Sequence, residues 1–223
     1  MNFTETFLNS DVFLQTYPLL LSGLSITVQL GLFSIVAGLI LGLFTALVRL
    51  YSMKFFQIVA KIYIDLFRSI PLLVLLIIIY YALPFVGLTL PPFFAAAAAL
   101  TFVSGAYTAE IFRAGIEAIP KGQFEASQAL GLSRRHMMKD VILPQAIKIV
   151  IPPMTNNCIN VLKDTALASV VAMPDLLKQA TQAQALTANP TPLIVAAVFY
   201  LLLLWPMVIF VSRLEKKYKV GDR

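Results

Sequence analysis

The feature that most constrains this chain is an apolar run from residue 18 to residue 48 that contains no charged residue. A helix that crosses the hydrocarbon core of a bilayer needs ~20 mostly apolar residues, so this run is long enough to cross. Four more apolar segments follow, at about 70–88, 93–113, 147–172 and 192–212. Backbone polar groups find no water inside a bilayer, so each segment must be helical. The sequence therefore predicts an all-α membrane protein with five transmembrane helices in a single domain, 1–223.

Basic residues set the orientation of these segments. All but Lys163 and Lys178 of the 17 Lys and Arg residues lie within 49–68, 113–148 and 213–223, after the first, third and fifth segments. Because Lys and Arg concentrate on the cytoplasmic side, the N-terminus is expected outside and the C-terminus in the cytoplasm. The net charge of +6 is thus a topology signal, and no nucleic-acid partner is expected.

The first cytoplasmic link, 54–68, has one polar stripe and is otherwise apolar. Its polar residues are spaced by three or four, which is typical of an amphipathic helix that lies in the membrane interface. They are Lys54, Gln57, Lys61, Asp65 and Arg68. The link is therefore predicted to be an in-plane helix.

Small residues recur every four positions in the first segment, at Gly38, Gly42 and Ala46. Such spacing lets helices approach closely in lipid. Two alternatives follow: packing inside one helix bundle, or an interface between subunits.

Residues 114–149 are too polar to cross a membrane but include helix formers. Pro120 and Gly122 break the chain after the third segment, and a short helix is expected over 122–131, stopped by Gly131. Ser133 is suited to cap a second helix. The short helix is expected to expose Glu125, Ser127 and Gln128 to the cytoplasm. On these residues alone, the segment is either a solvated connector or a docking element.

Several motifs resemble one known family. Glu125-Ala126, then Gly131, then Ile142-Leu143-Pro144, resembles the EAA loop of ABC importer permeases. Three more stretches resemble motifs of the polar-amino-acid branch of that family, the histidine, glutamate, glutamine and cystine type. They are 67–72 (FRSIPL), 106–115 (AYTAEIFRAG) and 163–167 (KDTAL), the last with Ala166 in place of the usual Ser.

The resemblance implies a type I importer permease in a bacterial inner membrane. The 122–131 helix would be the coupling helix that docks on an ATPase, through Gln123, Glu125, Ala126, Ser127, Gln128 and Gly131. It further implies two ABC ATPase subunits, a second permease chain (identical or paralogous), an extracytoplasmic solute-binding protein and an amino-acid substrate. The chain lacks GxxxxGK[ST], a motif that cradles nucleotide phosphates. It is therefore expected to be no enzyme and to bind no cofactor, with ATP and Mg at the partner ATPase.

The fourth segment carries polar residues at bilayer depth, where a charge costs ~2.5 kcal/mol or more and usually marks function. Asn157, Asn160 and Asp164 are spaced by three and four, so they share a helix face. This face is predicted, with Thr165, to line the substrate path, where Asp164 would accept hydrogen bonds from a substrate ammonium and Asn157 would read its carboxylate or side chain. The alternative is that these residues are hydrogen-bonding links between helices.

A structural clamp is expected near the cytoplasmic end of the third segment. Glu110 and Arg113 are three residues apart and can form an ion pair on one helix. Arg68 and Lys163 are assigned to the same structural role, Lys163 by bonding to neighbouring helix ends.

The outer loop, 173–191, is expected to begin a helix near Pro174 and Asp175 and to be either a contact for the binding protein or a plain connector. Two rival functions are weighed. A gradient-driven secondary transporter or channel subunit would usually have inverted repeats. An intramembrane enzyme would need a nucleophile with a base, or metal ligands. No clustered His, Cys or carboxylate ligands occur in the sequence, so no metal site is predicted.

Overall fold

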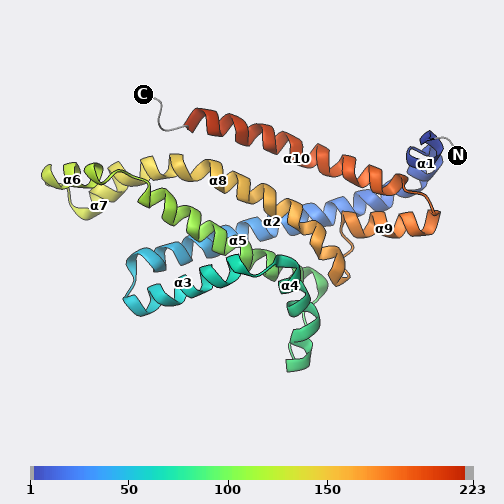
Figure 1. The fold of residues 1–223 in the computed structure, drawn as a ribbon, viewed down its shortest axis with the longest axis horizontal. Helices are drawn as coiled ribbons and strands as arrows, with labels where there is room; N and C mark the ends of the chain where they lie inside the picture. The colour runs from blue at the N-terminus through green and yellow to red at the C-terminus, as the bar shows by residue number, and fades with distance from the viewer. Residues whose placement is uncertain (1–2, 219–223) are drawn as a thin grey trace.

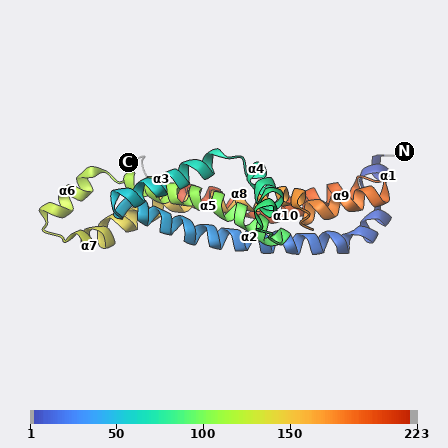
Figure 2. The same ribbon diagram turned by 90° about the horizontal axis from the view of Figure 1, so that it is seen from below.

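A computed structural model describes residues 3–218, all of whose regular elements are helical. Lys219 and Arg223, two of the basic residues used for orientation, lie outside the described residues. Figure 1 shows an elongated bundle with α6 (Lys121–Ala129) and α7 (Arg134–His136) at one end, and α1 (Phe3–Phe7) and α9 (Leu176–Thr187) at the other. The same arrangement is seen from below in Figure 2.

The longest helix, α2 (Ser10–Tyr51), runs nearly the length of the bundle and follows the short α1 (Phe3–Phe7). Asn9 starts it, because its side chain accepts hydrogen bonds from the backbone N–H groups of Asp11 and Val12 at 3.0 and 3.1 Å. With 42 residues, α2 is about 63 Å long at 1.5 Å per residue. The expected segment 18–48 is therefore only the middle of a helix that is longer than the hydrocarbon core.

The predicted in-plane helix is α3 (Lys54–Ser69), and it packs against both α2 and α5. Ile70 and Pro71 are extended, and the chain bends by 102° into α4 (Leu72–Ile77). A residue before proline is pushed out of the helical region, which explains the break. The turns η1 (Ile78–Ala82) and η2 (Leu83–Val86) continue α4. Whether α3 lies in the membrane plane stays a prediction.

The second long helix, α5 (Pro92–Glu117), packs along α2. Gly38 and Gly42 allow this approach: a Cβ at Gly38 would lie 2.8 Å from Ser104 Oγ, and one at Gly42 would lie 2.4 Å from Thr108 Cβ. Ala46 packs against Ile64 and Ala109. Of the two alternatives for these small residues, the structure therefore shows packing inside one chain.

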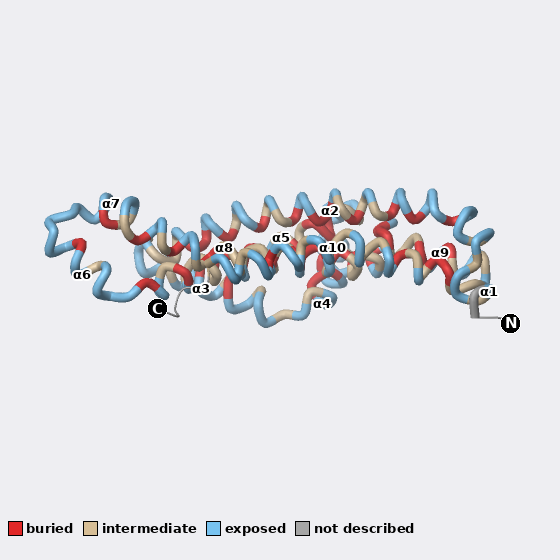
Figure 3. Tube along the Cα trace, turned by 90° about the horizontal axis from the view of Figure 1, so that it is seen from above, coloured by how far each residue is buried: buried red, intermediate tan, exposed pale blue. Residues whose placement is uncertain are grey.

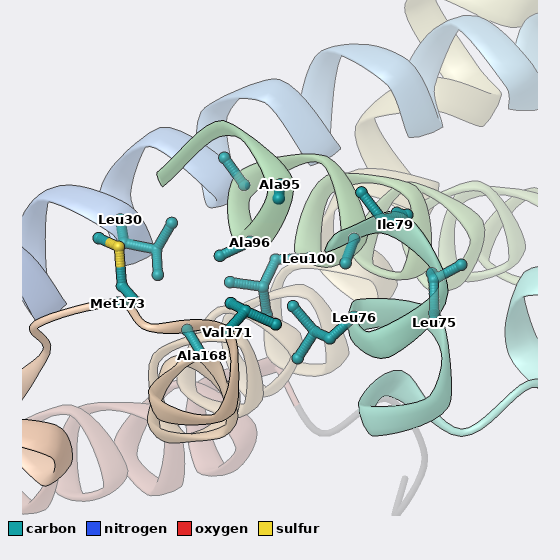
Figure 4. Close-up of a cluster of buried hydrophobic side chains, with 12 residues drawn as sticks. Leu30, Leu75, Leu76, Ile79, Ala95, Ala96, Leu100, Ala168, Val171 and Met173 are labelled. Carbon is teal, nitrogen blue, oxygen red and sulfur yellow. The ribbon is translucent and has the colours of Figure 1, made fainter. Parts of the chain in front are cut away.

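The largest apolar cluster joins α2, α4, α5 and η4 (Figure 4). Leu30 of α2 and Leu76 of α4 are fully buried in it. The alanine run at the start of α5 presents small side chains that let these elements approach closely. The cluster fixes α4 and η4 beside the polar part of α8.

The cytoplasmic stretch predicted between 114 and 149 contains α6 (Lys121–Ala129), α7 (Arg134–His136) and η3 (Met137–Ile142). Gly131 has φ +73° and ends α6: Leu132 N–H bonds to Ser127 O and Gly131 N–H to Gln128 O, the paired bonds of a Schellman motif. Ser133 caps α7, as expected, by accepting from His136 N–H. Figure 3 shows that this end of the molecule is mainly exposed.

The predicted fourth segment, 147–172, is not one continuous helix of those bounds. The helix α8 (Leu143–Asp164) begins earlier and ends at Asp164, and the tighter η4 (Thr165–Val171) follows. Ala172, at φ +57°, reverses the chain into α9 (Leu176–Thr187). The last helix is α10 (Thr191–Tyr218).

Three helices among residues 3–218 are long and apolar enough to cross a membrane, namely α2, α5 and α10, and the bent α3–α4 pair is a fourth candidate. The chain is a multi-pass membrane protein on this basis. The helix α8 is not among these candidates, because its polar side chains make it less apolar. The number of five transmembrane spans therefore stays a prediction.

Candidate functional site

A cavity of about 300 Å³ lies where α4, α5 and α8 meet. It contains three of the four predicted substrate-path residues, Asn157, Asn160 and Asp164, all from α8. Leu72 lines it from α4. The other lining residues are Leu100, Val103, Ser104 and Tyr107 of α5, and Val161 of α8.

The fourth predicted residue, Thr165, does not line this cavity. It is fully buried, and its hydroxyl donates to Leu162 O at 2.7 Å. The shared face predicted from the spacing of three and four holds only while the α-helix continues. Thr165 follows Asp164 directly, so it points about 100° away from Asp164 around the helix and lies off that face.

Asn157 has a structural contact as well as a place in the cavity wall. Its amide nitrogen donates to Ser104 Oγ and to Thr108 Oγ1, both at 3.2 Å, and its exposed fraction is 9%. These bonds join α8 to α5, which is the helix-linking role weighed above. Asn160 is exposed and has no such bond among the described residues.

Asp164 gives the cavity its chemical character, because it is the one ionisable carboxyl among the lining residues. The Tyr107 hydroxyl and the Asn160 amide add neutral hydrogen-bonding groups on other parts of the wall. A carboxylate in a partly enclosed cavity is suited to accept charge-assisted hydrogen bonds from an ammonium or guanidinium group.

A cluster of ion pairs adjoins the cavity, around Glu110 on α5. Arg49 Nη1 donates to Glu110 Oε2 at 3.0 Å, and Arg113 Nε donates to the same oxygen at 3.0 Å. Arg113 also pairs with Glu117. The expected Glu110–Arg113 pair is therefore present within α5, and the Arg49–Glu110 bond ties α2 to α5.

Arg68 joins this cluster, but Lys163 does not. Arg68 Nη1 lies 3.7 Å from Glu110 Oε1, and its guanidinium carbon lies 5.5 Å from the centre of the Tyr107 ring. Lys163 is exposed and lines a separate apolar groove with Tyr200 and Trp205 of α10. Among the described residues, no hydrogen bond from Lys163 to a neighbouring helix end is present, so the structure does not provide the bond expected for it.

The predicted coupling helix exposes most of the residues assigned to it. Gln123, Glu125, Ala126, Gln128 and Gly131 are exposed. Ser127 is not: its exposed fraction is 3% and its hydroxyl donates to Gln123 O at 2.7 Å. The expected exposure of Ser127 is therefore wrong, because its position places it on the inner face of α6.

Sequence reasoning missed three residues of these sites. Arg49 was used only as a topology signal, although it lies in the last turn of α2, beside Glu110 of α5. Tyr107 was part of a motif without a role. Leu130 lies among the residues assigned to ATPase coupling and was given no role, although its exposed fraction is 80%. An apolar residue inside an otherwise polar loop was the available signal for Leu130.

Comparison with known proteins places these features in a family. Residues 38–220 match the model of the family described as binding-protein-dependent transport system inner membrane component. The chain is 40% identical over 207 residues to an arginine transport system permease protein, ArtQ, of Bacillus subtilis, covering 92% of this chain and 94% of the relative. It is 39% identical over 205 residues to a putative glutamine transport system permease protein, GlnP, of Rickettsia bellii, covering 91% and 94%.

Solved structures agree with the fold. The crystal structure of an amino acid ABC transporter with histidines matches with a TM-score of 0.87 and 38% identity, covering 92% of this chain and 96% of that one. An inward-facing structure of the MetNI methionine ABC transporter matches with a TM-score of 0.68 at 22% identity, covering 94% and 98%, and supports the fold alone. With a family model that spans most of its length and relatives of this similarity, the chain belongs to the family of binding-protein-dependent transport system inner membrane components.

Proposed function

We propose that this chain is the permease subunit of an ABC importer that carries a polar amino acid across the bacterial inner membrane. Membership of the family and the likeness to amino-acid permeases support the transport role. The observation that carries the substrate assignment is the cavity that holds Asp164 and Asn160 between α4, α5 and α8. Its volume of about 300 Å³ is at the lower end of the range typical of small-molecule sites, which suits an amino acid.

The cavity residues divide the recognition between them. The Asp164 carboxylate accepts hydrogen bonds from a cationic group of the substrate, and the Asn160 amide bonds to its remaining polar atoms. Asn157 mainly holds α8 on α5, because its amide nitrogen is already used by Ser104 and Thr108. A polar amino acid satisfies this arrangement, since its α-ammonium is present in every member of that class.

Energy comes from outside the chain in this account. Two ATPase subunits hydrolyse ATP with Mg and engage α6 from the cytoplasm, through exposed Glu125, Gln128 and Leu130. A second permease chain completes the pathway, and an extracytoplasmic binding protein delivers the substrate. The chain itself performs no hydrolysis and holds no cofactor, and it crosses the membrane with its N-terminus outside.

Substitution of Asp164 by Asn tests the substrate assignment. The variant keeps the shape of the side chain but loses its charge, so uptake by the assembled transporter is expected to fall roughly tenfold or more, the effect of a lost charge-assisted bond. Asp65→Asn is the matched control, because Asp65 is exposed on α3 outside the cavity. Uptake and selectivity equal to those of the native complex in Asp164→Asn would contradict the assignment.

A further inference from the structure

Arg68 lies between the cavity and the cluster of ion pairs around Glu110. Along α5, the cavity residues Ser104 and Tyr107 come first and Glu110 follows one turn later, toward α6. Arg68 contacts both ends of this turn, since it lies over the Tyr107 ring and near the Glu110 carboxylate. Its guanidinium therefore stands on the α6 side of the cavity, which the proposed function assigns to the cytoplasm.

The charge on Arg68 is the least neutralised in the cluster. Glu110 forms hydrogen bonds with Arg49 and Arg113, whereas Arg68 makes only the longer 3.7 Å ion pair and donates no hydrogen bond among the described residues. The Arg68 side chain is 38% exposed, against 20% for Arg49 and 22% for Arg113. Two acids, Glu110 and Glu117, pair with three arginines, which leaves one positive charge, and Arg68 is the arginine that contacts the cavity residue Tyr107.

Two features of the chain hold Arg68 at this point. It lies in the last turn of α3, two residues before the extended Ile70, so the bend into α4 follows directly after it and leads to Leu72 of the cavity. The Tyr107 ring gives its guanidinium a flat apolar support that a cation favours. A movement of α3 against α5 would shift Arg68 relative to both Tyr107 and Glu110.

We propose that Arg68 is a positioning residue that forms an electrostatic barrier on the cytoplasmic side of the Asp164 cavity. Held between the Tyr107 ring and Glu110, it opposes the passage of cations between the cavity and the cytoplasm until α3 and α5 move apart. The cavity thus has a negative group within its wall and a positive group at its inner side. The orientation in this inference rests on the proposed function, but the barrier itself is measured without transport.

Chemical labelling of the assembled transporter tests the barrier. Cys158→Ser removes the native thiol, and Asn160→Cys places a reporter in the cavity wall. Inside-out vesicles are treated with a cationic and with an anionic membrane-impermeant methanethiosulfonate, in the absence of nucleotide. Arg68→Gln is expected to raise the rate with the cationic reagent roughly tenfold, as removal of one nearby charge does, and to leave the anionic rate unchanged or lower.

Two further variants show whether the charge at position 68 is responsible for the change in labelling rate. Arg68→Lys keeps the charge and is expected to stay near the native rate. Lys61→Gln removes another cation of α3, seven residues before Arg68. Lys61 forms no ion pair among the described residues and lies outside the cavity, so this variant is expected to change neither labelling rate. An unchanged cationic rate in Arg68→Gln would overturn the inference, and so would an equal rise with both reagents, which indicates general loosening.

The labelling also separates this inference from the proposed function. Right-side-out vesicles of the same variants give the labelling rates from the opposite face of the membrane. If the chain is inserted in the reverse orientation, the charge dependence of labelling appears in these vesicles in place of the inside-out ones. A chain that carries no amino acid would fail the uptake assay and still show the barrier.

Discussion

At the scale of single residues, Asp175 is the buried acid that starts α9 in the outer loop. Its Oδ1 accepts a hydrogen bond from Lys178 N–H at 3.0 Å, and its exposed fraction is zero. The other oxygen, Oδ2, has no hydrogen-bond partner among the described residues. Burial raises the pKa of Asp175 to about 6, against the backbone hydrogen bonds at Lys178 and Leu177, which lower it.

This raised pKa predicts that α9 docks more firmly in acid. The folded state holds the proton more tightly than the unfolded state, so the stabilisation is complete below about pH 4 and is lost as the pH rises through about 6. Hydrogen-exchange protection of the α9 amides, corrected for the intrinsic rate, is expected to fall at least several-fold between pH 4.5 and 7.5. The nearby Lys178 ammonium also lowers the pKa of Asp175, but burial is the larger effect.

Asp175→Asn is the control for this effect, because it keeps a capping side chain without the titration. Its α9 protection is expected to be nearly independent of pH. A slope equal to that of the native protein would show that another group is responsible.

At the scale of helices, the close contact of α2 and α5 depends on Gly42. A Cβ there would lie 2.4 Å from Thr108 Cβ, so Gly42→Val must push the two helices apart. Overpacking of this kind costs about 1–3 kcal/mol, and a lower thermal midpoint of the detergent-purified protein is expected. Leu43→Val, on the exposed neighbouring position, is the matched control, and equal midpoints for the two variants would contradict the packing.

The exposed face of α6 predicts where a partner ATPase would dock. Glu125→Lys reverses a charge and Leu130→Ser removes an apolar side chain that is 80% exposed. Each is expected to reduce copurification of the ATPase several-fold while the permease still inserts into the membrane. Leu186→Ser, a similarly exposed leucine on α9, should leave recruitment unchanged, and native recruitment by both α6 variants would argue against docking through this face.

Local signals predicted these elements well. Gly131 and Ser133 located the end of α6 and the start of α7, because a left-handed residue and a side-chain cap are needed whatever the surroundings. The polar stripe from Lys54 to Arg68 gave α3 to within one residue. The bounds of α2 were less accurate, since apolarity marks the part of a helix inside lipid and not its ends.

Contacts between helices could not be predicted from a single sequence. The spacing of Asn157, Asn160 and Asp164 predicted their shared face, but the partners of Asn157 lie on α5, about 50 residues earlier in the chain. Thr165 was predicted to line the substrate path beside Asp164, but adjacent residues point about 100° apart on a helix, and Thr165 is buried. Ser127 was expected to be exposed together with Glu125 and Gln128, but its burial depends on how α6 is turned.

At the scale of the whole molecule, the bundle carries a polar cavity, and α6, the proposed docking helix, lies at one end. The cavity lies between α4, α5 and α8, and α5 leads from it through the Glu110 cluster to α6. Because α6 packs against η3, which continues into α8, a movement imposed on α6 can reach the cavity through these elements. The rival account of a gradient-driven transporter gives α6 no role.

Reconstitution in liposomes tests the central claim, that the transport energy enters from a separate ATPase. Uptake of a labelled amino acid would be measured with the permease alone, under an imposed ion gradient, and with the complete complex supplied with ATP and the binding protein. The account predicts uptake only by the complete complex, and only when the ATP can be hydrolysed. Concentrative uptake by the permease alone, without nucleotide, would contradict it.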